Sequence, residues 1–144
     1  AGGAQRRAIE NARVFRSRNL SVETWFLYRK RDTFDGEPGV CCLLDHRPEG
    51  VADYIRIFFR LWSGLWRARP RTVITYSHYA NIFGCLFAVL SGVPRRCANQ
   101  TGLPSKLPAA ARFLDVLFGS VGIYSSVISN SLTNHEALSR HPGR

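Results

Sequence analysis

Hydrophobic positions along the 144-residue chain follow two alternating patterns, one typical of helices and one typical of strands. In AIENARVF, residues 8–15, apolar side chains recur at helical spacing between charged ones and predict a helix over residues 4–18. Short continuous apolar runs, of which TVITY at residues 72–76 is the clearest, predict strands that are buried on both faces. The predicted helices cover 4–18, 51–69, 79–91, 110–119 and a segment after residue 131, and the predicted strands cover 21–28, 40–44, 72–76, 95–99 and 125–129.

The order of these elements predicts an α/β fold. Strands that alternate with helices form a parallel, doubly wound sheet, because each helix carries the chain back across the sheet between two strands. A Gly pair that opens a helix is typical of a strand-to-helix turn, so we expect a further strand before it and about six strands in a Rossmann-like sheet. Such sheets bind ligands outside the carboxyl ends of their strands. This rule selects the turn at Gly2 and Gly3, the step at Ser77 and His78, and residues 99–102.

Composition narrows the classes of partner. The net charge of +10 favours an anionic partner, which is nucleic acid, an acidic membrane surface or a phosphorylated substrate. A hydrophobic content of 45% and an aromatic content of 12% are those of a folded domain. No apolar run approaches the roughly 20 residues that cross a bilayer. The four cysteines lack C-x-x-C spacing, so we expect no metal site and interpret all four as apolar core residues in a reducing compartment.

Three segments together resemble the N-terminal domain of retaining glycosyltransferases of the GT-B fold, in particular those similar to glycosyltransferase family 4. GGAQR at residues 2–6 is similar to the family's glycine-rich turn before its first helix. TVITYSHYANIFGCLFAVLSGVPRR at residues 72–96 resembles its strand, His-containing turn, helix and Gly-Val-Pro step. VISNSLTNHEALSR at residues 127–140 resembles the strand and helix that lead to the interdomain linker, so the resemblance covers essentially the whole chain.

This resemblance implies a fold and an activity. Residues 1–144 would form a single Rossmann-like, acceptor-side domain, one half of a two-domain GT-B architecture whose first strand and C-terminal donor domain lie outside this fragment. The enzyme would be a hexosyltransferase-like glycosyltransferase that transfers a sugar from a nucleotide-sugar to a lipid-linked, saccharide or other hydroxyl acceptor, with retention of configuration. No cofactor or metal is expected, and the fragment alone is expected to be inactive. The resemblance implies a cytoplasmic protein with peripheral contact at the inner face of the membrane.

The resemblance also assigns roles at the beginning of the chain. The N–H groups of Gly2 and Gly3, supported by the helix dipole, would contact donor phosphate or sugar, although a tight turn by itself also requires glycine. Gln5 and Arg6 lie in the first helical turn and are expected to reach the cleft and bind substrate.

Two further places carry the remaining candidates. Ser77 and His78 follow a strand and begin a helix, whose N-terminus favours a neutral imidazole. The family places a comparable His near the transferred sugar, so His78 is the catalytic candidate, orienting hydroxyls rather than acting as an obligatory base. Asn99, Gln100 and Thr101 are expected to bind substrate, and ordinary loop polarity is the alternative. Where the family often has a His in this segment, this chain has Gln100 or Thr101.

Residues 54–71, YIRIFFRLWSGLWRARPR, are both basic and aromatic. On a helical wheel, three arginines fall on one side and four large apolar residues on another: Arg56, Arg60 and Arg67, and Ile55, Phe59, Trp62 and Trp66. Phe58 and Leu65 widen the apolar arc. One interpretation is a helix packed on the sheet through its apolar side, with an arginine-rich outer face. The other is that its Trp and Arg side chains also touch an anionic membrane surface.

Two other functions are open. A nicotinamide-dependent reductase would need a strand followed by G-x-G-x-x-G, and GGAQRR lacks the third glycine of that pattern. A basic, non-enzymatic domain that binds a membrane surface or nucleic acid agrees with the net charge of +10. No nucleic-acid recognition module is evident, so we rank nucleic acid below the other anionic partners.

Overall fold

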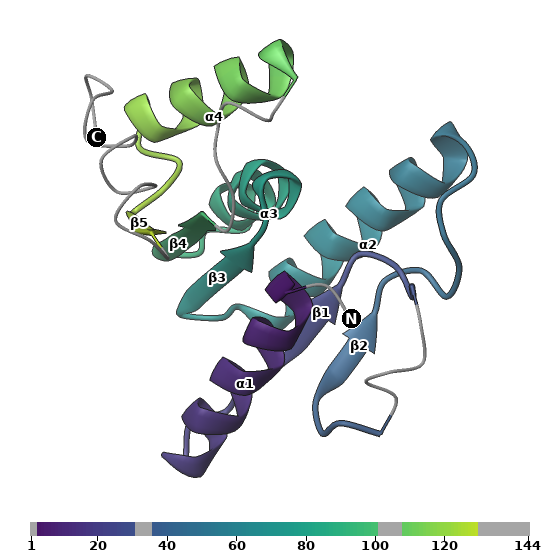
Figure 1. The fold of residues 1–144 in the computed structure, drawn as a ribbon, viewed down its shortest axis with the longest axis vertical. Helices are drawn as coiled ribbons and strands as arrows, with labels where there is room; N and C mark the ends of the chain where they lie inside the picture. The colour runs from purple at the N-terminus through teal and green to yellow at the C-terminus, as the bar shows by residue number, and fades with distance from the viewer. Residues whose placement is uncertain (1–2, 31–35, 101–107, 130–144) are drawn as a thin grey trace. The chain divides into compact units, whose positions relative to one another are not determined.

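The computed structural model describes residues 3–30, 36–100 and 108–129, and in these residues it contains four helices and five strands (Figure 1). In chain order they are α1 (Gly3–Ser17), β1 (Thr24–Phe26), β2 (Val40–Cys42), α2 (Val51–Ala68), β3 (Thr72–Tyr76), α3 (His78–Leu90), β4 (Arg95–Gln100), α4 (Ala109–Ser120) and β5 (Ser126–Ser129). The chain divides into two compact units, Ala1–Ser63 and Gly64–Arg144. Gly2, Thr101 and the predicted helix after residue 131 lie outside the described residues.

The predicted α/β class and its parallel strands are confirmed. The described strands form two small open sheets, with the order β1-β2 in one and β3-β4-β5 in the other, in place of one sheet of about six strands. Every pair of neighbouring strands is parallel. The helices match the predicted ranges to within two residues, whereas the strands predicted over 21–28 and 40–44 shorten to three residues each.

In the first unit, α1 packs on the short β1-β2 sheet. The residues at helical spacing that predicted α1 include its buried face, Ala8, Ile9 and Ala12. The helix ends where Asn19 adopts a positive φ of 59°, and the guanidinium of Arg16 then donates to the carbonyl of Val22 at 2.8 and 3.1 Å. These bonds hold the chain where it turns into β1.

In the second unit, α3 joins β3 to β4 and α4 joins β4 to β5 (Figure 1). The core is formed by Cys85, Ala98 and Tyr124 with Phe118, Ile123 and Val127 around them. Helix α3 approaches β3 closely at Gly84, where an added Cβ would lie 2.7 Å from Cγ2 of Thr75. Gly92, at a positive φ of 72°, ends α3 as the sequence predicts.

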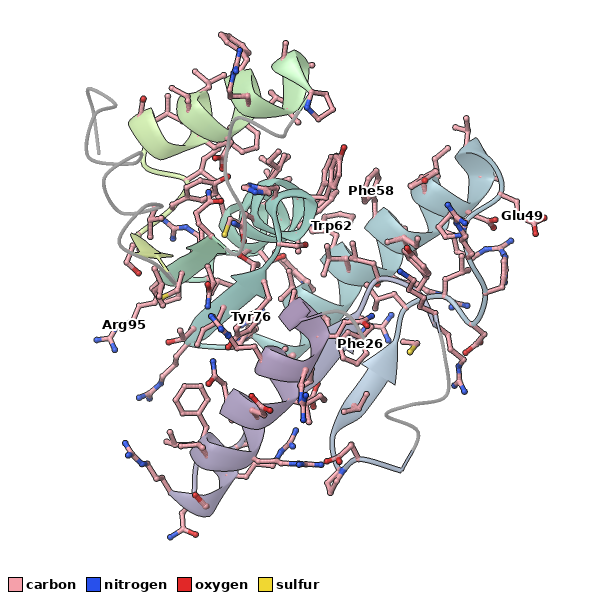
Figure 2. The ribbon with its side chains drawn as sticks, in the orientation of Figure 1. Phe26, Glu49, Phe58, Trp62, Tyr76 and Arg95 are labelled. Atoms are coloured by element: carbon pink, nitrogen blue, oxygen red, sulfur yellow. The ribbon has the colours of Figure 1, made fainter. Side chains whose placement is uncertain are left out.

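Arg96 has a structural role that the sequence did not indicate. Its guanidinium donates to the carbonyls of Val93 at 2.6 Å, Ile123 at 2.7 Å and Gly122 at 3.1 Å. These carbonyls belong to the turns before β4 and β5. Arg96 therefore ties together the amino ends of two neighbouring strands, whereas its neighbour Arg95, labelled in Figure 2, is exposed.

The buried face of α2 differs from the prediction. The structure buries Ile57, Leu61 and Leu65, which are 2%, 7% and 5% exposed. Of the apolar side that was expected to pack on the sheet, Leu65 is buried, whereas Ile55, Phe59, Trp62 and Trp66 are open to solvent. The prediction failed because apolar residues cover more than one face of this helix, and helical spacing does not say which of these faces meets the core.

The interpretation of the cysteines is right for one residue and wrong for another. Cys85 is fully buried in the core, and burial raises the pKa of its thiol to about 11. Cys41 is exposed, in the middle of a strand whose other two residues are only half-buried. Among the described residues, no helix is long and apolar enough to cross a membrane.

Candidate functional site

The carboxyl edge of the β3-β4-β5 sheet brings together four of the predicted site residues. Ser77 and His78 directly follow β3, and Asn99 and Gln100 end β4. Because β3 and β4 are parallel, with Tyr76 opposite Asn99, the two strand ends are neighbours. The tyrosine is labelled in Figure 2. This is the edge at which open α/β sheets bind ligands.

Ser77 has a strained backbone. Its φ of 125° and ψ of 155° lie in a region that is populated almost only by glycine. Its carbonyl accepts the first bond of α3 from the N–H of Asn81 at 2.8 Å, but its side chain makes no capping hydrogen bond. A conformation of this kind costs about 1–3 kcal/mol and is retained where the surrounding structure imposes it, often at functional sites. The turn is therefore a candidate functional feature in its own right.

A buried hydrogen-bond chain lies beneath this turn and holds it to both strands. The hydroxyl of Thr75 donates to Oδ1 of Asn81 at 2.7 Å, and Nδ2 of Asn81 donates to the backbone carbonyl of Asn99 at 3.3 Å. Thr75 is 7% exposed and Asn81 is completely buried. The chain connects β3, the first turn of α3 and the carboxyl end of β4. Sequence reasoning missed Asn81, although an asparagine inside the apolar helix segment YANIFG was a usable signal.

Gln100 is held by a second buried network, on α4. Its Nε2 donates to Oδ2 of Asp115 at 3.0 Å, and the hydroxyl of Tyr124 donates to Oδ1 of the same carboxylate at 2.8 Å. All three residues are at least 90% buried. Asp115 fixes the orientation of the Gln100 amide. If the amide were reversed, its oxygen would face the oxygens of Asp115 and no hydrogen bond would form. Asp115 and Tyr124 were not among the predicted residues, and nothing in their local sequence marks them.

Three buried polar atoms at this edge have no hydrogen-bond partner among the described residues: Nδ1 of His78, Oδ1 of Asn99 and Oε1 of Gln100. Asn99 and Gln100 are 4% and 1% exposed. A buried polar atom without a partner costs about 1–3 kcal/mol, so three of them at one sheet edge call for an explanation. Two of these atoms are acceptors, and the imidazole nitrogen is a donor or an acceptor according to its tautomer. Each of these atoms could pair with a hydroxyl group of a neutral ligand.

The remaining predicted residues belong to the first unit. Gly3 begins α1, and a Cβ added to it would meet no atom within 4 Å, so no neighbour in the described structure demands a glycine there. Gln5 is half-buried, and Nε of the exposed Arg6 forms an ion pair with Glu10 at 3.2 Å. In the described part of the chain, no group of three His, Cys, Asp or Glu side chains could hold a metal ion.

Comparisons with protein-family models, with curated proteins and with solved structures found no match to this chain.

Proposed function

We propose that this chain is the acceptor-side domain of a retaining glycosyltransferase of the GT-B type. The observation that carries the proposal is the set of unpaired buried atoms of His78, Asn99 and Gln100 beside the strained Ser77. Sugar hydroxyls donate and accept hydrogen bonds, so they satisfy neutral amide oxygens and an imidazole nitrogen without requiring a charged partner. The resemblance of residues 2–6, 72–96 and 127–140 to these enzymes supports the same assignment.

The proposed reaction uses these groups for positioning. In the retaining reaction, the bond between the donor's anomeric carbon and the diphosphate oxygen breaks. The acceptor oxygen bonds to the same face of that carbon, and its proton passes to the departing phosphate. His78, Asn99 and Gln100 would hold hydroxyls of the sugar and the acceptor in the reactive arrangement. Precise positioning of this kind contributes a large share of the rate, and loss of about 1 Å in placement lowers it up to about a hundredfold.

Asn99 offers the sharpest test of the proposal. Asn99→Leu keeps the branching of the side chain at Cγ and removes Oδ1, which has no partner among the described residues, so folding loses no bond to that atom. We expect unchanged thermal stability and a kcat/KM lower by about tenfold, corresponding to one lost hydrogen bond of about 1.4 kcal/mol. His78→Ala should lower kcat/KM by about tenfold to a hundredfold.

The assay is transfer of radiolabelled sugar from a panel of nucleotide-sugars to lipid-linked and saccharide acceptors, in the full-length protein that contains this chain. Ser91→Ala is the matched control, because its Oγ is also buried without a described partner but lies at the opposite end of α3. It should leave kcat/KM within about twofold. The proposal is wrong if no donor supports transfer by the folded protein, or if the Asn99 variant loses stability without losing activity.

A further inference from the structure

Helix α2 carries an exposed stripe of large apolar side chains along its length. The stripe consists of Val51, Ile55, Phe59, Trp62 and Trp66, which are 76%, 63%, 61%, 40% and 54% exposed. Their spacings of three and four residues keep them on one side of the helix over about 22 Å. Trp62 is labelled in Figure 2, and its ring meets that of Phe59 edge to face at 6.4 Å.

The stripe is not the buried face of α2. That face is formed by Ile57, Leu61 and Leu65, which are buried. On a helical wheel the centre of the stripe lies about 120° away from the centre of the buried face. The helix is therefore anchored on one side and still presents a continuous apolar surface on another, which is unusual for a surface helix.

Arginines border the stripe. Arg56, Arg60 and Arg67 form a row on the neighbouring face of α2, and all three are exposed. Arg60 donates to the backbone carbonyl of Leu43 at 2.6 Å and Arg56 pairs with Asp53 at 3.7 Å, so Arg67 is the member of the row best placed to meet a partner. Just beyond the helix, the guanidinium of Arg69 lies 5.6 Å from the ring centre of Trp66, a cation–π contact. Aromatic residues beside arginines are typical of helices that lie in the headgroup region of a membrane, because these rings have an apolar body and tolerate the polar boundary.

The charges and side chains favour a lipid surface over other occupants. A net charge of +10 attracts the chain to an anionic surface. The same charge opposes pairing of two copies through α2, because pairing would bring two arginine rows together. Val51 and Ile55 have no ring that could stack on a nucleic-acid base, yet they are among the most exposed residues of the stripe. We propose that α2 lies on an anionic phospholipid surface, with the stripe between the headgroups and Arg67 at the lipid phosphates. This proposal does not depend on glycosyl transfer.

The test is flotation of the protein with vesicles of phosphatidylcholine alone, and with vesicles that contain about 30% phosphatidylglycerol. We expect binding to the anionic vesicles only. Phe59→Ser with Trp62→Ser should weaken it at least tenfold, because two apolar anchors are lost. Arg67→Glu should weaken it by about thirtyfold, since each charge near an anionic surface contributes about 1 kcal/mol. The controls are Phe113→Ser and Arg112→Glu on α4, which are also exposed and should leave binding within about twofold.

Tryptophan fluorescence locates the contact independently of affinity. The chain has three tryptophans, Trp25, Trp62 and Trp66, of which the last two belong to the stripe. Anionic vesicles should shift the emission of the Trp25→Phe variant to shorter wavelength. They should not shift that of the Trp62→Phe, Trp66→Phe double variant. Circular dichroism confirms that each variant is folded.

Several outcomes would overturn the proposal. Equal binding to both kinds of vesicle would refute the electrostatic part, and binding that ignores the Phe59 and Trp62 substitutions would refute insertion of the stripe. If the protein forms a dimer that these substitutions dissociate, and vesicles do not bind, the stripe pairs with a second copy. If the same substitutions abolish binding to duplex or single-stranded DNA instead, the partner is nucleic acid.

Discussion

The strained turn at Ser77 allows a prediction that separates stability from function. Its φ of 125° and ψ of 155° place its Cβ in a conformation that costs about 1–3 kcal/mol, and glycine removes that cost. Glycine in turn loses about 0.5–1 kcal/mol more backbone entropy on folding. The difference predicts that Ser77→Gly stabilises the protein by about 1 kcal/mol, which corresponds to a rise of about 3 °C in Tm for a domain of this size.

Two further substitutions establish the cause. Ser77→Ala keeps the Cβ and removes a hydroxyl that makes no capping bond, so its stability should stay within about 0.5 kcal/mol of the parent. Ser63→Gly, in the regular helical backbone of α2, should destabilise by about 0.5–1 kcal/mol. If the strain orders the site, Ser77→Gly also lowers kcat/KM although the protein has become more stable.

The assay is thermal unfolding followed by circular dichroism, together with urea denaturation at 25 °C, for the parent and the three variants. Destabilisation of Ser77→Gly by the same amount as Ser63→Gly would show that the Ser77 backbone stores no strain. Equal stabilisation by alanine and glycine would show that the hydroxyl, and not the Cβ, is the unfavourable group. Either result would refute the reasoning.

Three other predictions concern the supports of the fold. Gly84→Ala should destabilise the protein by about 2 kcal/mol in urea denaturation, since its Cβ would lie 2.7 Å from Thr75, whereas Gly50→Ala, with no atom within 4 Å, should change stability by less than about 0.5 kcal/mol. Asp115→Leu should cost about 2–3 kcal/mol in the same measurement, because two buried donors lose a charged acceptor. Asp53 accepts a bond from a backbone N–H at the start of α2, which lowers the pKa of its carboxyl below the ordinary 3.8. Its contribution is therefore present above about pH 4 and is lost as the pH falls through the lowered pKa, so Asp53→Asn should reduce the acid sensitivity of unfolding below about pH 4.

The sequence alone was sufficient for the local elements. Helical spacing predicted α1, α3 and α4 because apolar repetition and helix-ending residues are local properties, and the β-branched run at residues 72–76 predicted β3 for the same reason. The order of strands and helices then predicted parallel pairing. The rule that ligands bind at carboxyl ends selected Ser77, His78, Asn99 and Gln100, which the structure places on two neighbouring strand ends.

Only the tertiary structure decided which surfaces meet. Helix α2 has apolar residues on more than one face, and their spacing does not say which face is buried; the structure buries Ile57, Leu61 and Leu65. Asp115 reaches Gln100 from 15 residues away, and the strain at Ser77 exists only because a strand and a helix hold both of its neighbours. Sequence pattern determines what a segment can become, whereas burial, strain and unpaired polar atoms arise from contacts between segments.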